Sequence, residues 1–352
     1  MYPVLLRQSL IEKTHAGNRL ARSVAGVLLG LGCAALLPTA AMANDRATSP
    51  EATTPTYTLV TEPSQGLTSI YNLITSAKKT IDMTMYELSD TTVTKLLAQE
   101  VTEGVKVRVI LDQNLEKSNN TTAYNYLNSH GVTVHWANTK YQATHQKTIT
   151  VDGATTAIMT LNLTPQYYST SRDFAIIEND ANDIAAIEAT FAKDLTNSTV
   201  TPGDGDDLVW SPTNSLSSLE SIIDNAKYTL QVENEEMGDS SIVSALEAAA
   251  KRGVNVEIMM TYNSDYASEL TALKKAGCHI VTYASTASLY IHAKVVLADY
   301  NKTTANVFVG SENFSNPSLT ENRELGVIIA NKTIMTSLNT TLTSDYKGGT
   351  AY

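Results

Sequence analysis

Cysteine and tryptophan are scarce in this 352-residue chain, and basic residues are fewer than acidic ones. The two cysteines exclude a disulfide scaffold, so folding must depend on an apolar core. There are 25 Lys and Arg against 36 Asp and Glu, a formal net charge of -11, which argues against holding nucleic acid through broad charge neutralisation. The hydrophobic content of 43% with 17% charged residues is typical of a globular protein and excludes disorder and collagen.

An apolar run near the N-terminus has the layout of a secretory signal. Four basic residues and one acidic residue precede the run over 24–37, and Ala41-Met42-Ala43 follows it. This order predicts a signal peptide over 1–43 and a secreted or periplasmic bacterial protein, with an uncleaved anchor as the alternative. Cleavage after Ala43 would take away those four basic groups and one acidic group, which changes the net charge from -11 to -14. Residues 44–56, rich in Ser, Thr, Ala and Pro, are predicted to be a flexible leader.

An internal repeat organises the rest of the chain. Gly104-Val105-Lys106-Val107 matches Gly253-Val254-Asn255-Val256 at an offset of 149 residues, and the flanking helical patterns recur at the same offset. The alternation of strands and helices predicts an α/β fold of two similar halves, 57–200 and 208–352, each a mixed β-sheet flanked by helices. The active site is expected at the interface of the halves. Residues 201–207 are predicted to be a linker, and a solvated turn is favoured there over a Ca²⁺ loop because the EF-hand ligand spacing is absent.

The hydrophobic periodicity also places individual elements. It predicts helices over 67–78, 91–103, 123–128, 216–227, 240–252 and 269–275, and strands over 80–86, 104–110, 132–135, 228–232, 253–259 and 279–281.

A His-x-Lys pair followed by an aspartate occurs twice with the same spacing. Four residues separate His145-Gln146-Lys147 from Asp152, and four separate His292-Ala293-Lys294 from Asp299. On a strand, each histidine would share one face with its lysine. Asp152 and Asp299 lie beyond that strand, so both are expected to bind backbone and to take no part in the chemistry.

This pair of motifs resembles the signature of the phospholipase D superfamily, whose members cut or exchange phosphodiester bonds. Gly310-Ser311-Glu312-Asn313 matches the family's G-S-x-N element, and Met159-Thr160-Leu161-Asn162 stands in its place in the first half, with methionine instead of glycine. Asp173 and Glu324 occupy the position of a family acid that contacts a catalytic histidine. The resemblance spans roughly residues 57–346.

The resemblance and the chemistry of phosphodiesters suggest a role for each residue. A neutral imidazole can attack phosphorus to form a phospho-histidine, and a second, protonated histidine can give its proton to the leaving alkoxide. His145 is favoured as the nucleophile and His292 as the acid/base; the near symmetry of the halves leaves the reverse open. Phosphate binding is assigned to Lys147, Lys294, Asn162 and Asn313. The hydroxyls of Thr160 and Ser311 are expected to contact the substrate. Asp173 and Glu324 are expected each to orient the histidine of its own half.

Three functions stay open at this point. The first is a secreted phospholipase D that hydrolyses phospholipid head groups, the second a metal-independent nuclease of the same superfamily, and the third a non-catalytic relative that binds phosphodiesters, for which Met159 gives grounds. The acidic balance and the lack of a basic stripe favour phospholipid over nucleic acid, with transient contact to a membrane surface.

The sequence also bears on cofactors, partners and one acidic run. No metal or other cofactor is predicted, because the other histidines show no ligand spacing with a Cys or carboxylate cluster. A monomer suffices for the site, because one chain carries both motifs. The acidic run Glu233-Asn234-Glu235-Glu236 follows a strand, and it is interpreted as a solvated loop in preference to a part of the site.

Overall fold

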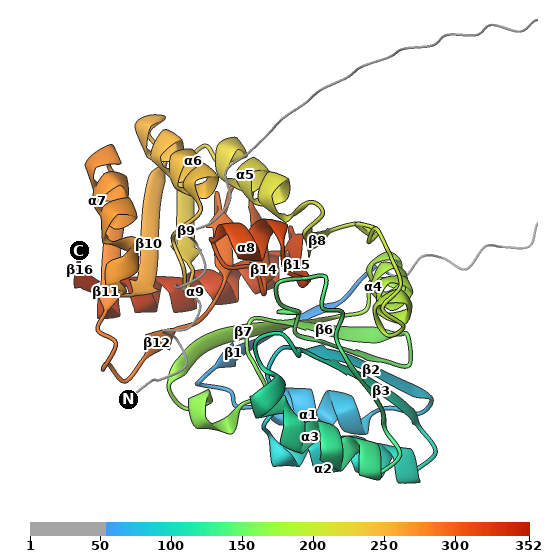
Figure 1. The fold of residues 1–352 in the computed structure, drawn as a ribbon. Coiled ribbons are helices and arrows are strands. Elements are labelled where there is room, and N and C mark those ends of the chain that lie inside the picture. Colours follow the sequence, from blue (N-terminus) through green and yellow to red (C-terminus); the bar gives the residue numbers. More distant parts are fainter. Residues whose placement is uncertain (1–53) are drawn as a thin grey trace, which may run out of the picture. The chain divides into compact units, whose positions relative to one another are not determined.

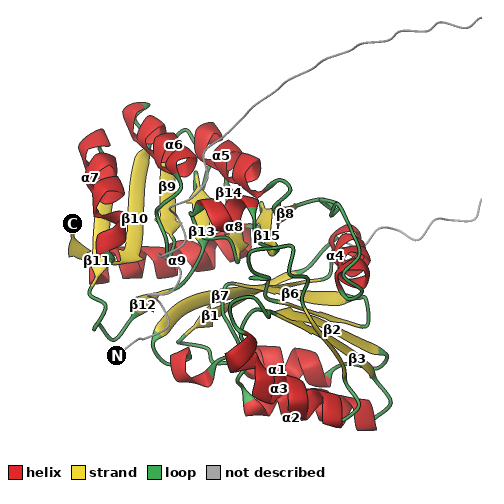
Figure 2. Ribbon diagram, in the orientation of Figure 1, coloured by secondary structure: helices red, strands yellow, loops and turns green. Residues whose placement is uncertain are grey.

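Two mixed β-sheets carry the fold of residues 54–352, which are the residues that the computed structural model describes. The predicted signal peptide and residues 44–53 of the predicted leader lie outside this part of the chain. Within residues 54–352 the sheets and their flanking helices form two similar α/β halves, as the sequence predicts (Figures 1 and 2).

The first sheet has the strand order β1-β7-β6-β5-β2-β3-β4, and β12 adds to it by pairing with β7. Its strands are β1 (Tyr57–Glu62), β2 (Thr80–Met85), β3 (Lys106–Leu111), β4 (Thr133–Trp136), β5 (Thr148–Val151), β6 (Thr155–Met159), β7 (Ser171–Glu178) and β12 (Tyr290–Ile291). Strands β2, β3 and β4 run parallel, while β2 pairs with β5, β5 with β6, β6 with β7 and β7 with β1 antiparallel. Because β12 comes from the second half of the chain, backbone pairing already joins the two halves.

The second sheet has the order β16-β11-β10-β9-β13-β14-β15-β8. Its strands are β8 (Leu208–Ser211), β9 (Thr229–Glu233), β10 (Asn255–Thr261), β11 (His279–Tyr283), β13 (Val295–Ala298), β14 (Asn306–Gly310), β15 (Glu324–Ile329) and β16 (Thr350–Ala351). The core order β11-β10-β9-β13-β14-β15-β8 repeats the order β4-β3-β2-β5-β6-β7-β1 of the first sheet, so the duplication seen in the sequence extends to the topology.

Helices pack on both sheets. They are α1 (Thr68–Thr75), α2 (Thr91–Thr102), α3 (Lys117–Ser129) and α4 (Ala181–Asp194) in the first half, and α5 (Ser215–Asn225), α6 (Ser240–Lys251), α7 (Ala267–Ala276), α8 (Asn316–Thr320) and α9 (Lys332–Gly348) in the second, with 3-10 turns η2 at Pro165–Tyr167 and η3 at Ser264–Tyr266. The ribbon shows α1–α3 on one face of the first sheet (Figure 1). It shows α5–α7 on one face of the second sheet and α9 on the other face.

Local sequence explains where the repeated helices begin and end. Asp90 and Asp239 cap α2 and α6, each accepting hydrogen bonds from two backbone N–H groups of the first turn. Gly104 and Gly253 follow these helices with φ of 91°, a left-handed conformation that favours glycine and turns the chain into β3 and β10.

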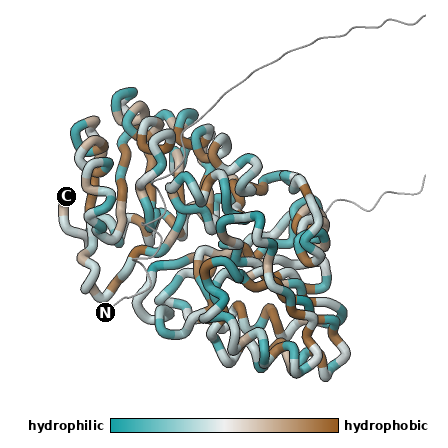
Figure 3. Tube along the Cα trace, viewed as in Figure 1, coloured by the Kyte–Doolittle hydropathy of each residue, from teal (hydrophilic) through white to brown (hydrophobic). Residues whose placement is uncertain are grey.

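Three large apolar clusters and a small fourth one around Phe191 fill the described part of the chain. One lies between the first sheet and α1–α3, and a second between the second sheet and α5–α7. The third joins the halves: it unites Ile158 and Phe174 of the first sheet with Val309 and Leu325 of the second and with Leu338 of α9. The apolar stretches follow the strands in Figure 3. This shared core fixes the two sheets against each other, and with them the residues at their common edge.

The predicted linker over 201–207 is only partly a solvated turn. Asp204 and Asp206 are exposed, but Pro202 is buried. The carboxylate of Asp183 in α4 accepts hydrogen bonds from the backbone N–H groups of Asp206 (2.7 Å) and Asp207 (3.3 Å). The segment is therefore held against α4, a contact that its composition does not reveal.

Candidate active site

The two His-x-Lys segments lie at the place where the halves meet. His145 and Lys147 precede β5, and His292 and Lys294 lie between β12 and β13, so the expectation that each pair sits on a strand is wrong by one to three residues. Each segment is held by the backbone of the opposite half. The N–H of His145 donates to the carbonyl oxygen of Arg323 (2.9 Å), and the N–H of His292 donates to that of Arg172 (3.2 Å).

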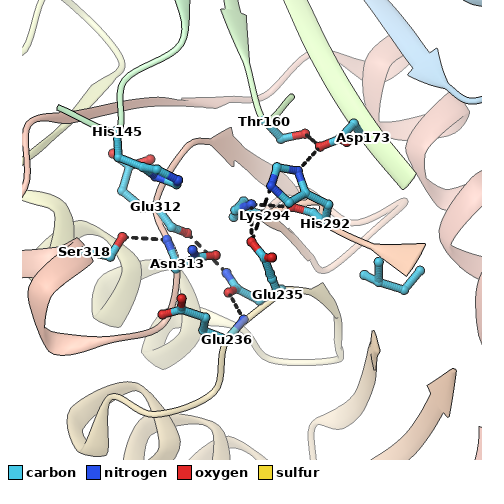
Figure 4. A network of polar contacts seen from close by, with 12 residues as sticks. His145, Thr160, Asp173, Glu235, Glu236, His292, Lys294, Glu312, Asn313 and Ser318 are labelled. Atoms are coloured by element: carbon cyan, nitrogen blue, oxygen red, sulfur yellow. Dashed lines mark hydrogen bonds and ion pairs between the residues drawn. The ribbon is translucent and has the colours of Figure 1, made fainter. Parts of the chain in front are cut away.

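The two acids cross over between the halves. Nδ1 of His145 lies 2.7 Å from Oε2 of Glu324. Nδ1 of His292 lies 2.7 Å from Oδ1 of Asp173, a contact that Figure 4 shows. The sequence order suggests that each acid binds the histidine of its own half. In the structure each acid instead binds the histidine of the other half. An ionised carboxylate only accepts hydrogen bonds, so each Nδ1 carries the proton.

Burial sets the charge state of His145. The residue is 4% exposed, and burial lowers its pKa to about 4 even though the negative charge of Glu324 acts in the opposite direction. Burial alone would raise the pKa of Glu324, but the charge and hydrogen bond of His145 outweigh it, so the pKa of this carboxyl is lowered. At neutral pH the imidazole is therefore uncharged, and its Nε2 has a lone pair.

The two lysines are fully buried beside the histidines. Each Nζ donates to the backbone carbonyl of the histidine two residues before it, which curls the side chain toward the site. Nζ of Lys147 also lies 4.9 Å from the ring centroid of Tyr86. Burial, together with the charge of Lys294, lowers the pKa of Lys147 to about 7.

Glu235 belongs to the site, and the interpretation of its surroundings as a solvated loop is wrong. Glu233 and Asn234 are fully buried at the end of β9. Oε2 of Glu235 lies 3.0 Å from Nζ of Lys294 and 3.4 Å from Nε2 of His292 (Figure 4). The one sequence signal for this residue was its position after a repeated strand, where sites of α/β folds gather.

The hydroxyl groups expected to contact substrate are engaged inside the protein. Thr160 is fully buried; its Oγ1 donates to Oδ1 of Asp173 (2.5 Å) and accepts from the N–H of Phe174 (2.9 Å). Ser311 is fully buried as well, and its Oγ accepts from the N–H of Leu325 (3.1 Å). Both the donor and the acceptor of the Thr160 hydroxyl are thus engaged, so Thr160 positions the acid that binds His292 and its expected substrate contact is wrong. The contact of Ser311 uses only an acceptor lone pair, so its substrate contact stays a prediction.

The asparagines differ from these hydroxyls. The side-chain oxygens of Asn162 and Asn313 are buried and have no hydrogen-bond partner within residues 54–352. The backbone N–H of Asn313 donates to Oγ of Ser318 (Figure 4), and this hydroxyl in turn donates to Oε1 of Glu324. The side-chain amide of Asn313 is thus held next to the His145–Glu324 pair, where it can bind a phosphate oxygen.

The motif aspartates lie away from this cluster and bind backbone. Asp152, at φ 56°, accepts hydrogen bonds from the N–H groups of Lys78, Lys79 and Thr80. Asp299, at φ 51°, does the same for residues 227–229 and also accepts from the hydroxyl of Thr304. Both contacts are those expected of residues that tie the end of one strand to the start of another.

Comparison with known proteins decides the family. The model of the family described as "Cardiolipin synthase, PLD-like domain" matches residues 70–195 and 219–346. The chain belongs to the phospholipase D-like family. One match falls within each half of the chain, and members of the superfamily process phosphodiesters.

Solved structures share the phospholipase D-like fold at low sequence identity. The phosphatidylserine synthase of Haemophilus influenzae Rd KW20 is 13% identical with a TM-score of 0.64, over 84% of this chain and 87% of that one. The polyphosphate kinase of Porphyromonas gingivalis is also 13% identical with a TM-score of 0.64, over 82% of this chain, which spans 50% of the kinase. At this identity the likeness establishes the fold alone. No match was found among curated protein sequences.

The methionine that departs from the family's G-S-x-N element is explained by packing. Gly310 pairs with Gly326, and a Cβ at Gly310 would lie 2.4 Å from Oε2 of Glu312. In the first half Met159 pairs with Ala175, and its side chain is buried in the apolar cluster under α1–α3. Met159 therefore points into the core of this phospholipase D-like half and does not obstruct the histidines.

Two further observations concern the surroundings of the site. No helix in the described part of the chain is long and apolar enough to cross a membrane. Trp210 is buried in the core shared by the halves, and Trp136 stacks on Tyr124 at a centroid distance of 4.3 Å. Both tryptophans serve packing.

Proposed function

We propose that this phospholipase D-like protein is a phosphodiesterase that works through a phospho-histidine on His145, with His292 as the acid/base. The observation that carries the proposal is the crossed pairing of His145 with Glu324 and of His292 with Asp173. This pairing brings two imidazoles and two ammonium groups to one place, with Asn313 held beside the His145–Glu324 pair. It supplies a nucleophile, a proton donor and phosphate ligands in a single chain.

The environments of the two histidines support this division of roles. His145 is neutral, and with its proton on Nδ1 its Nε2 can attack phosphorus. His292 has carboxylate oxygens near both ring nitrogens, Asp173 at Nδ1 and Glu235 at Nε2, and both nitrogens can donate only when the ring carries two protons. The structure thus favours one of two assignments that the sequence left nearly symmetric.

The reaction then runs in two steps. In the first, a bond forms between Nε2 of His145 and phosphorus, the bond to the leaving oxygen breaks, and the proton on Nε2 of His292 passes to that oxygen. In the second, His292 takes a proton from water while the water oxygen attacks phosphorus and the P–N bond breaks. Lys147, Lys294, Asn162 and Asn313 offset the charge on the phosphate oxygens in both steps.

Phospholipid is the proposed substrate class. Besides the acids paired with the histidines, Glu87, Asp112 and Glu116 act electrostatically on Lys147, and Glu236 acts on Lys294. Burial raises the pKa of all four carboxyls, to about 7 for Glu87 and Glu236, so they are not all charged at neutral pH. The net charge of the chain is what disfavours a polyanion. A single phosphodiester in a lipid head group meets less repulsion.

One panel of substrates tests the function. Vesicles of phosphatidylcholine, phosphatidylethanolamine and phosphatidylglycerol, supercoiled plasmid and bis-p-nitrophenyl phosphate are each incubated with wild type, His145→Ala and His292→Ala, with and without EDTA. We expect head-group release that survives EDTA and is lost in both variants. Plasmid nicking with the same dependence on both histidines would identify a nuclease instead. Activity on none of the three substrate classes would favour a protein that only binds phosphodiesters.

Export is a separate part of the proposal and rests on residues 1–43 alone. The basic residues, the apolar run and Ala41-Met42-Ala43 predict cleavage after Ala43. Expression of the full chain in a bacterium, followed by mass spectrometry of the protein in periplasm and medium, should find a mature form that begins at Asn44. A cell-associated protein that keeps its N-terminus would contradict export.

A further inference from the structure

Glu235 places a carboxylate among the groups that the proposed function assigns to the substrate. Its side chain is 9% exposed and lies just past the end of β9. Oε2 is 3.0 Å from Nζ of Lys294 and 3.4 Å from Nε2 of His292, while Oε1 accepts a hydrogen bond from the hydroxyl of Tyr290 (2.9 Å). Figure 4 shows the carboxylate between the lysine and the imidazole.

These two nitrogens are the ones that a substrate needs in the second half of the site. Nζ of Lys294 is a ligand for a phosphate oxygen, and Nε2 of His292 must deliver the proton to the leaving oxygen. A carboxylate oxygen has the charge and hydrogen-bonding capacity of a non-bridging phosphate oxygen. One oxygen atom of Glu235 therefore stands where an oxygen of the phosphodiester would be bound.

The first half has no such anion at the corresponding position. The residue 149 positions before Glu235 is Tyr86, whose ring lies over Nζ of Lys147 at 4.9 Å and edge-on to the imidazole of His145 at 4.5 Å between centroids. An aromatic face attracts the ammonium group without a net negative charge. The anionic occupant is thus confined to the half that holds the acid/base.

We propose that Glu235 is an internal anion that occupies the phosphate position beside Lys294 and His292 in the free protein, so that the substrate phosphate must displace it. The inference rests on the proposed function, because it assumes that the two half-sites together bind one phosphate group. Burial alone would raise the pKa of this carboxyl, but Lys294 and His292 hold it at about 2, so the competitor stays charged at all pH values of interest.

A competing carboxylate has a definite effect on ligand binding. Removing its charge while keeping its shape frees Lys294 and His292 for an external anion, so that Glu235→Gln should bind inorganic phosphate about tenfold more tightly than wild type. A residue that merely positions Lys294 for the substrate would have the opposite effect, because phosphate binding would weaken when its charge is lost. The direction of the change decides between the two roles.

The test is isothermal titration of the full chain with inorganic phosphate, in which no turnover is needed. Glu257→Gln is the matched control, because this substitution removes the same charge from a residue outside the site. Glu257 lies on β10 and accepts a hydrogen bond from the side-chain amide of Gln231. The expected result is tighter binding in Glu235→Gln and no change in Glu257→Gln. Thermal unfolding of each variant confirms that the compared proteins are folded, and Glu235→Ala provides a second variant without any side-chain amide.

The outcomes separate this inference from the proposed function. Unchanged or weaker phosphate binding in both Glu235 variants overturns the inference, whatever the activity of the protein. Tighter binding in a protein that hydrolyses none of the phosphodiesters supports the internal anion and overturns only the proposed catalysis. Equal tightening in Glu257→Gln also overturns the inference, because the effect would then come from the overall charge.

Discussion

Nδ1 of His145 lies 2.7 Å from Oε2 of Glu324, a residue 179 positions later in the chain. The reciprocal contact joins His292 to Asp173, 119 positions earlier. Each histidine is therefore oriented by a carboxylate that its own half does not supply. The two imidazoles nevertheless differ, because Tyr86 lies beside His145 and Glu235 beside His292. This difference leads to the first prediction.

Phosphorylation should be found on His145. With bis-p-nitrophenyl phosphate the leaving group needs no proton, so His292→Asn should still form the phospho-enzyme and then hydrolyse it slowly. His145→Asn should form none. Rapid quenching in alkali followed by peptide mass spectrometry locates the phosphoryl group. A phosphoryl group on His292, formed in His145→Asn, would reverse the two roles.

The pH profile of kcat/KM should have one limb near pH 4 and another near pH 7. His145 attacks only when neutral, so activity is expected to rise as the pH increases through its pKa of about 4. Lys147 binds phosphate best when charged, so activity is expected to fall as the pH increases through its pKa of about 7. Because kcat/KM reports the free enzyme, a vesicle or chromogenic assay over pH 3–10 measures both limbs. Lys147→Arg should remove the upper limb, and an upper limb that stays near pH 7 in this variant would have another source.

Asp152 should contribute to stability and not to catalysis. Asp152→Ala removes the acceptor of three backbone N–H groups and should lower the free energy of unfolding by about 2 kcal/mol, with kcat/KM per folded molecule unchanged. Burial would raise the pKa of this carboxyl, but the bonds from residues 78–80 outweigh it and lower the pKa below 3.8. The stabilisation is therefore present above the unfolded pKa and is lost as the pH falls through the folded one.

Urea unfolding at pH 7 and pH 3 checks both parts of this prediction. The difference between wild type and Asp152→Ala should shrink at the lower pH. A loss of kcat/KM in the folded variant would show that Asp152 takes part in the reaction.

Two glycines of the linker should respond very differently to substitution. Gly205 has φ of 57°, and a Cβ there would lie 2.0 Å from Oδ1 of Asp183, the atom that binds the backbone of the linker. Gly205→Ala should lower the free energy of unfolding by about 2–3 kcal/mol or more. At Gly203 the nearest atom would be 3.7 Å away, an ordinary contact, so Gly203→Ala should have little effect. Thermal melts of the two variants test the pair, and similar losses in both would contradict the proposed docking of the linker on α4.

The repeated elements could be predicted from sequence because their signals are local. Alternating apolar residues after Gly104 and Gly253 predict β3 and β10, and the structure confirms both. The helix predicted over 123–128 extends in the structure to Lys117–Ser129, since its first turns are polar and carry little hydrophobic pattern. Helix α9 is not among the predicted elements, although the sequence has a signal for it: Ile334, Leu338 and Leu342 recur at helical spacing, and Asn331 caps the first turn.

Most members of the site could be predicted from the motifs, but Glu235 and the contacts between the members could not. The motifs identify the histidines, lysines and asparagines, but the crossing of Asp173 and Glu324 depends on how the halves dock, which no local pattern records. Thr160 has the residue type of a substrate ligand, yet its hydroxyl is engaged by Asp173. Glu235 was misread because an acidic run after a strand is usually solvated, and here the strand end faces the motif of its own half.

Because Asp173 and Glu324 cross between the halves, the proposed active site is complete only after both halves have folded and docked. While the ribosome has released only the first half, His145 has neither Glu324 nor the backbone carbonyl of Arg323 to hold its ring, and no proton donor faces it. If the proposed function is right, a nascent or truncated chain should be inert toward phosphodiesters, and activity should appear only when the two halves dock. The rate at which turnover recovers during refolding should therefore report the rate at which the two halves dock.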